Sequence, residues 1–175
     1  MATDLTNLVV GLDVSLAVVS QKALDLSTPQ ESLSFSKAFA LVFGTGALAA
    51  NQQFSDRRTL NASANETLDL VGALTNGFGG TISLAKVKAI IIRNTSDLLA
   101  SPTIATMKIE PGATPPDNCP TIPLLPAGGI AVIACDSADG FLGTLAGGSK
   151  DGIKITNLSG SLGLQYDVVF IGESA

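Results

Sequence analysis

The chain has 175 residues, of which 46% are hydrophobic and only 14% are charged, and its formal net charge is -5. This length fits one domain, or one domain with an arm. The sequence contains no histidine, which excludes Ser-His-Asp, Cys-His and histidine-based zinc sites. The acidic balance argues against nucleic acid as a partner, because binding phosphates requires several Lys or Arg side chains on one face.

The N-terminus lacks the basic stretch and apolar core of a signal peptide. The longest apolar runs, such as Ala89 to Ile92, are too short to span a bilayer. We therefore expect synthesis in a cytoplasm and no contact with a membrane. A chain this poor in charge has few means of repelling its neighbours, which favours a permanent assembly over a crowded solution of monomers.

Residues 1–50 are predicted to form an extended N-terminal arm. Apolar side chains recur at every second position, which is typical of a strand with one apolar face; they are Leu8, Val10, Leu12, Val14 and Leu16. Leu33, Phe35, Phe39, Leu41 and Phe43 follow the same period. The alternative is a short amphipathic helix near residues 15–26. An apolar arm finds no cover within its own monomer. We therefore identify five of its residues as interface candidates, namely Leu8, Val10, Leu12, Val14 and Leu16.

Residues 51–175 are predicted to form an antiparallel β-sandwich or jelly roll. A loop rich in glycine is expected from Gly72 to Gly80, and Pro111-Gly112 marks a further break. No long helical pattern interrupts this region, which argues against a βαβ architecture. The expected strands, bounded by such turn signals, are 68–71, 81–94, 103–110, 122–126, 130–134, 152–157 and 164–172.

Asp56, Arg57 and Arg58 form the one local charge cluster in this weakly charged chain. The plainer interpretation is a solvated turn at the start of the sandwich. The functional interpretation is a contact between subunits, because Arg is favoured in protein interfaces. Arg57 and Arg58 therefore join the interface candidates.

No pattern predicts catalysis, a cofactor or a metal site. Gly44 to Ala49 superficially matches a dinucleotide fingerprint but lacks its third glycine and the βαβ context. Asp136 to Gly140 offers too few oxygen ligands for calcium, and no nucleophile with its base can be named. Cys119 and Cys135 are expected to be unpaired thiols, although a disulfide between them stays open. We expect a protein that is not an enzyme.

Five segments resemble small virion proteins of tailed phages in their spacing and residue types. The segments are 53–60, 68–79, 87–94, 152–157 and 165–172. The resemblance covers roughly residues 40–175, whereas the first 40 residues carry no comparable match. The resemblance implies a structural component of the particle. Such proteins include jelly-roll cement proteins that sit on capsids as trimers, and components of tails or fibres.

The leading expectation is therefore a capsid cement or decoration protein on the virion surface, assembled in the host cytoplasm. It would act as a homo-oligomer, as a trimer under the resemblance, and would contact the major capsid protein. The alternative is a tail, fibre or receptor-binding module that recognises carbohydrate, since jelly rolls also host lectins. The shortage of aromatic residues, 5% of the chain, weakens that alternative because sugars usually stack on Trp or Tyr.

Overall fold

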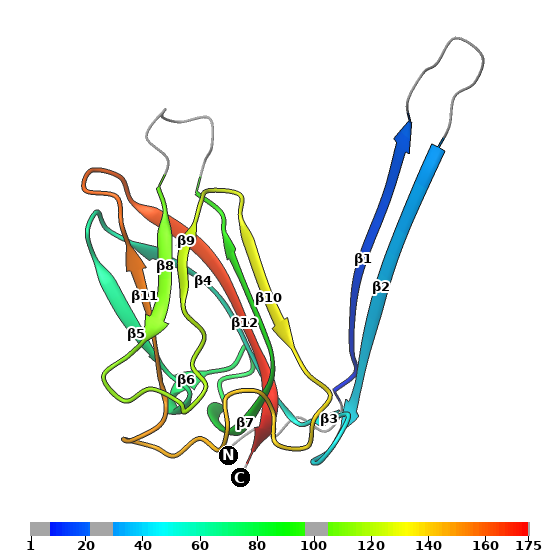
Figure 1. The fold of residues 1–175 in the computed structure, drawn as a ribbon. Coiled ribbons are helices and arrows are strands. Elements are labelled where there is room, and N and C mark those ends of the chain that lie inside the picture. Colours follow the sequence, from blue (N-terminus) through cyan, green and yellow to red (C-terminus); the bar gives the residue numbers. More distant parts are fainter. Residues whose placement is uncertain (1–7, 22–29, 97–104, 175) are drawn as a thin grey trace, which may run out of the picture.

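The protein is all-β in the computed structural model, which describes residues 8–21, 30–96 and 105–174. Within these ranges the chain forms strands, turns and loops and no helix. A two-stranded hairpin diverges from a compact body made of two sheets (Figure 1). The predicted fold class, an antiparallel β-sandwich with an extended N-terminal arm, is confirmed.

The arm is an antiparallel hairpin of β1 (Val10–Gln21) and β2 (Gln30–Phe43). At its base, the two-residue strand β3 (Ala49–Ala50) pairs with the end of β2 in parallel. Over residues 15–21 the extended interpretation is correct and the helical one is wrong, because Ser15 to Gln21 pair strand to strand with Ser36 to Gln30. Residues 22–26 of the helical alternative lie outside the described residues.

The body consists of two facing sheets. The first sheet has the order β10 (Ile130–Ala134), β7 (Thr81–Asn94), β12 (Leu164–Ser174), β4 (Gln52–Leu60), and β6 (Val71–Thr75) also pairs with β7. The second sheet has the order β5 (Asn65–Asp69), β11 (Gly152–Asn157), β8 (Met107–Pro111), β9 (Ile122–Leu125). The main contacts within both sheets are antiparallel.

The eight main strands pair in a nested order. The first of them, β4, pairs with the last, β12, and the second, β5, pairs with the second last, β11. Inside these, β7 pairs with β10 and β8 pairs with β9. These eight strands therefore form one long two-stranded ribbon that is folded over into two layers.

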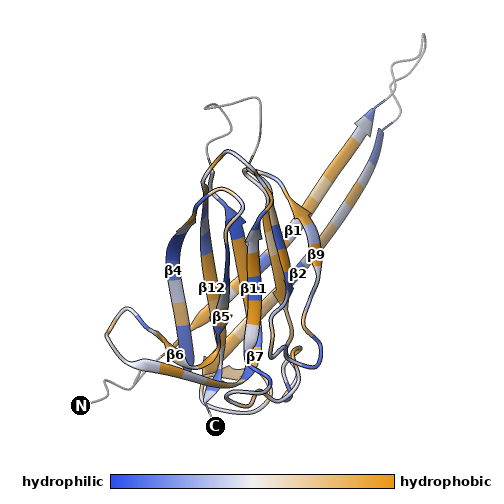
Figure 2. Ribbon diagram, turned by 90° about the vertical axis from the view of Figure 1, so that its left-hand side faces the viewer, coloured by the Kyte–Doolittle hydropathy of each residue, from blue (hydrophilic) through white to orange (hydrophobic). Residues whose placement is uncertain are grey.

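The core lies between the two sheets, where alternate residues of each strand point inward. Phe54 of β4 and Phe170 of β12 stack with ring centroids 6.0 Å apart. Tyr166 is fully buried, and its hydroxyl donates to Glu66 Oε1 at 2.8 Å across the two sheets. Hydropathy colouring shows the same alternation along the strands of both the body and the arm (Figure 2).

Two predicted loops are strands. The expected turn at Asp56–Arg58 lies within β4, which follows β12 from Gln52 to Leu60. This strand carries few branched or aromatic residues, so its composition did not mark it, and pairing with β12 decides its conformation. The expected loop after Val71 begins with β6, whose pairing with β7 is irregular. The start of the expected strand 103–110 lies partly outside the described residues, and β8 begins at Met107.

Candidate assembly surface

The arm has two chemically different faces. Residues that are paired across its strands share a face, so Leu16 lies with Phe35 and Val18 lies with Leu33 on the apolar face. The opposite face carries Ser15, Ala17 and the serines of β2. Large apolar side chains along the outer part of the apolar face are exposed to solvent, and they are Val14, Leu16, Val18, Leu33 and Phe35. An isolated two-stranded hairpin is at best marginally stable in water, so this face needs a cover.

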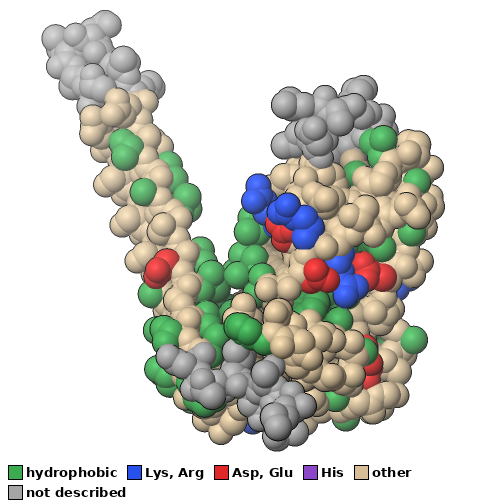
Figure 3. All heavy atoms as spheres, turned by 180° about the vertical axis from the view of Figure 1, so that it is seen from behind, with side chains coloured by type: hydrophobic (Ala, Val, Ile, Leu, Met, Phe, Trp, Pro, Cys, Tyr) green, Lys and Arg blue, Asp and Glu red, His purple; other side chains and the backbone are tan. Residues whose placement is uncertain are grey.

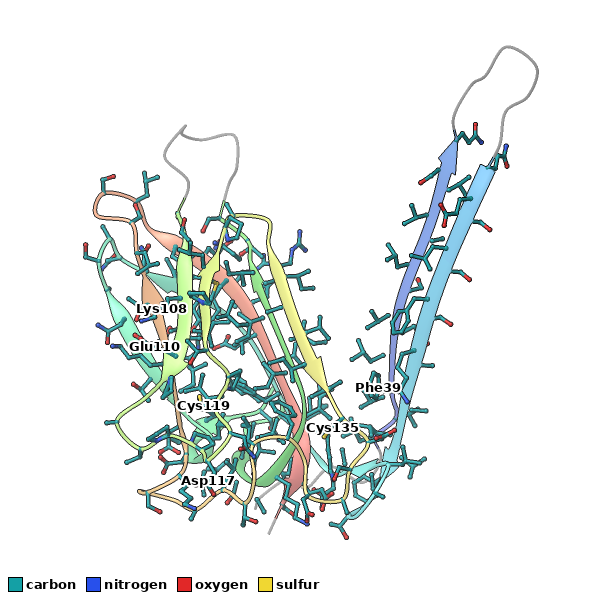
Figure 4. The ribbon with its side chains drawn as sticks, in the orientation of Figure 1. Phe39, Lys108, Glu110, Asp117, Cys119 and Cys135 are labelled. Carbon is teal, nitrogen blue, oxygen red and sulfur yellow. The ribbon has the colours of Figure 1, made fainter. Side chains whose placement is uncertain are left out.

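The base of the arm is already covered by the first sheet. Leu8 and Leu41 form a small second core with Ala89 of β7 and Ile171 of β12, and Val10 packs at its margin. Phe39, on the same side of the arm, lies near the base beside Lys37, whose Nζ is 5.0 Å from its ring centroid (Figure 4). The apolar face of the arm is therefore the face that turns toward the sandwich.

The outer face of the first sheet is arranged in rows across β10, β7 and β12. The lowest row is Ala134, Ala89 and Ile171, which the base of the arm covers. The row above it is Val132, Ile91 and Val169, which we name the open row. Val132 is exposed, whereas Ile91 and Val169 are half-buried and Val169 packs at the margin of the second core. Viewed from behind, arm and sandwich diverge, with hydrophobic side chains on both walls of the opening (Figure 3). The outer face of the second sheet is polar by contrast, with Lys108, Glu110, Lys154 and Thr156.

A buried ion pair fixes the junction of arm and sandwich. Lys88 is fully buried, and its Nζ lies 2.6 Å from Glu173 Oε1. The same ammonium donates to the carbonyl oxygens of Gly46, Ser137 and Ala138 at 3.1, 2.5 and 2.8 Å. Gly46 lies just after the arm, and the other two carbonyls follow β10, so one side chain ties three segments together. The loop that leaves the base of the arm is thereby tied to the first sheet.

Sequence reasoning missed Lys88 because a β-bulge places it. In the register of β7 with β12, Ala89 pairs with Ile171 and Val87 pairs with Gly172, so Lys88 has no partner residue. The bulge breaks the alternation, and Val87, Lys88 and Ala89 are buried in succession. Gly172 is required there, because a Cβ on it would lie 2.0 Å from the carbonyl oxygen of Lys86. The only sequence signal was a lysine beside a continuously apolar run.

The five arm candidates occupy different environments. Val14 and Leu16 are exposed on the apolar face, whereas Leu12 is half-buried. Leu8 and Val10 pack within their own chain, at the base of the arm. Among the described residues of the arm, only the outer part of the predicted interface is therefore free to bind another molecule.

The two arginine candidates point to opposite sides of β4. Arg57 lies on the outer face, and its guanidinium donates two hydrogen bonds to the Asp167 carboxylate, at 2.6 and 3.0 Å. These hydrogen bonds lower the pKa of Asp167. Arg58 contacts Glu66 and Asp56, and Glu66 also accepts the Tyr166 hydroxyl. Arg58 thus supports the contact between the two sheets, and Arg57 borders the open row.

A separate hollow of about 260 Å³ lies between β4 and the loop after β6. Gln53, Ser55, Asn76 and the exposed ring of Phe78 line it. The Asn76 side chain is engaged locally, since its Oδ1 accepts the backbone N–H groups of Phe78 and Gly80. The hollow thus combines amide and hydroxyl groups with one aromatic face.

The described part of the chain contains no group of three His, Cys, Asp or Glu residues that could hold a metal ion. Cys119 and Cys135 are both free thiols (Figure 4), which confirms the unpaired interpretation. Burial raises the pKa of Cys119 to about 11, so this thiol is protonated at neutral pH and is a poor nucleophile. Among the described residues, none belongs to a helix of the length and hydropathy needed to cross a bilayer.

Comparison with known proteins gives no relative for this chain: no family model matches it, and neither does any curated protein or solved structure.

Proposed function

We propose that the chain is a non-enzymatic structural subunit of a virus particle, a capsid cement or decoration protein that acts as a homo-oligomer on the major capsid protein. The observation that carries this proposal is the apolar face of the arm, which the chain's own described residues leave open beyond its base. Exposed apolar surface of this extent is typical of interaction sites. A long two-stranded arm suits a subunit that must hold its neighbours.

The nested order of the eight strands supports a jelly-roll topology. A jelly roll arises when one long antiparallel ribbon folds over into two sheets, which is how β4 to β12 pair. Viral capsid proteins and lectins are the common users of this topology. Only 14% of the residues are charged, and five segments of the sequence resemble small virion proteins. Both observations favour a capsid protein over a lectin.

Self-association tests the first half of the proposal. Light scattering after size exclusion should give an oligomer for the wild type. The double variant Leu16→Thr with Phe35→Thr changes one facing pair on the apolar face and keeps residues of high β propensity. We expect it to weaken each arm contact by about 2–3 kcal/mol, roughly 30- to 150-fold in Kd.

The matched control is Ala17→Thr with Ser34→Thr, the neighbouring facing pair on the polar side of the same arm. This control should associate as the wild type does, and circular dichroism should report an intact fold for both variants. A wild type that stays monomeric at micromolar concentration would overturn the proposal.

Location tests the second half. Electron cryo-microscopy of particles purified from cells that produce the protein should show a sandwich-sized density with a projecting arm on the head surface. The same density confined to the tail would refute the cement version and leave a structural role elsewhere in the particle.

A glycan-binding module is the second candidate, and the hollow beside Phe78 is the observation that favours it. An aromatic face beside amide and hydroxyl groups is the usual composition of a sugar site. A glycan array should then give hits that are lost in Phe78→Ser with Gln53→Ala. An array with no hits at high protein concentration removes this candidate.

A further inference from the structure

We infer that the outer part of the arm packs its apolar face on the open row of a second copy of this chain, so that two copies exchange arms. The contact would place Leu16 and Phe35 of one copy on Val132, Ile91 and Val169 of the other. This inference rests on the proposed homo-oligomeric function and names the surface and the partner through which it works.

The packing of the arm base within one chain is the model for this contact. Leu41, on the apolar face of the arm, already packs with Ala89 and Ile171 on the outer face of the first sheet. The open row continues that sheet face by one step, through the pairs Val132–Ile91 and Ile91–Val169. The same two faces therefore meet at the base and separate above it, which shows that their surfaces are chemically compatible.

The chain's own arm covers its own open row only at one edge, where Val169 packs at the margin of the second core. Exposure along the apolar face rises from the buried Leu41 to 40% at Val14 and 52% at Leu16, while Val132 on the facing sheet is 37% exposed. The Lys88 contacts fix the arm's base, and Lys37 Nζ on the apolar face lies 3.5 Å from Asp136 Oδ2 at the mouth of the opening. A junction held in this way keeps the opening available to an incoming arm.

The area agrees with a specific association. From Val14, the first exposed apolar residue of the face, to Gln21 the arm strand spans about 26 Å, and two strands are about 10 Å wide, which gives a face of about 260 Å². Reciprocal exchange makes two such contacts and buries about 1,000 Å² over all four surfaces, which reaches the lower limit of about 1,000 Å² for a biological interface. Beyond Val169 this sheet face continues past Asp167 and Arg57 as a shallow, open surface.

Disulfide trapping between different chains tests the inference directly. In a background with Cys119→Ala and Cys135→Ser, one chain carries Leu16→Cys and a second carries Val132→Cys. Mixed in a glutathione redox buffer, they should form a heterodimeric disulfide at least about tenfold faster than a control pair, because docking raises the effective concentration of the thiols. The control pair is Ala17→Cys with Val132→Cys, since Ala17 lies on the opposite face of the arm.

Each other outcome overturns the inference in a recognisable way. Dominant Leu16→Cys homodimers would show that arms pack on arms. An intramolecular disulfide at nanomolar concentration in a chain with both substitutions would show that the arm closes on its own sheet. Absence of the heterodimer from chains that light scattering shows to be oligomeric would refute arm exchange and leave the proposed function standing, whereas a monomeric wild type would refute both.

Discussion

The sandwich and the arm share the same sequence pattern, in which apolar residues alternate with polar ones, but their apolar side chains differ in burial. In β7, Ile82 and Leu84 alternate with polar residues and are fully buried. In the arm, Leu16 and Phe35 also alternate with polar residues, yet they are 52% and 58% exposed. Alternation fixes which face of a strand is apolar, whereas the partner that covers the face is determined by what else the chain folds against it.

The difference follows from the number of layers. Each sheet of the sandwich covers the inner face of the other, so side chains such as Phe170 and Ile153 lose all contact with water. The arm is a single layer that meets the body only at its base, where Leu41 is buried. Its remaining apolar face needs cover from another molecule. We therefore interpret the sandwich as the folding unit and the arm as the element that mediates assembly.

Truncating one phenylalanine in each region should separate these roles most strongly. Phe170→Ala removes a fully buried ring that stacks on Phe54 and should lower the free energy of unfolding by about 3–5 kcal/mol. Phe35→Ala in the arm should change it by less than about 0.5 kcal/mol in the monomer. Urea denaturation of both variants measures the difference, and equal losses would show that the arm belongs to the sandwich's cooperative unit.

Breaking the junction should give the next largest effect. Lys88→Met removes the cation and leaves the Glu173 carboxylate buried beside no ammonium, which we expect to cost about 3 kcal/mol in unfolding free energy. The double variant Lys88→Met with Glu173→Leu should recover part of this loss, because no buried charge then remains unpaired, while the carbonyl groups of Gly46, Ser137 and Ala138 still lack the ammonium donor. Denaturant melts complete the double-mutant cycle, and a double variant as unstable as the single one would contradict the pairing.

The sequence predicted the parts of the fold that depend on local pattern. The expected strands 81–94, 130–134 and 152–157 match β7, β10 and β11, because branched residues and flanking glycines mark them. It failed at β4, whose polar segment Asp56–Arg58 is held extended by β12, more than a hundred residues away in the chain. The sequence also predicted only that the arm is extended, because neither segment alone indicates that β1 pairs with β2.

The candidate site was half visible. Alternation located the apolar face of β1, including Val14 and Leu16, from the sequence. The open row could not be found in this way, because Ile91, Val132 and Val169 come from three strands that only the sheet order brings together. Lys88 was hidden by a bulge that no periodicity predicts.

The smallest expected effect sharpens the contrast between the two outer faces of the sandwich. On the second sheet Glu110 lies beside Lys108 (Figure 4). It forms ion pairs with Lys108 and Lys154, and hydrogen bonds from these ammonium groups lower its pKa from 4.5 to about 2. A folded-state pKa below the ordinary value means that the stabilisation is fully present above about pH 4.5 and is lost as the pH falls through about 2. Lys154→Met should therefore raise the pKa of Glu110, as an NMR titration of its carboxyl carbon would show. Lys150→Met, which removes the partner of Asp117 instead, should leave that titration unchanged. A wild-type Glu110 that titrates near 4.5 would contradict its pairing with Lys108 and Lys154 on this face.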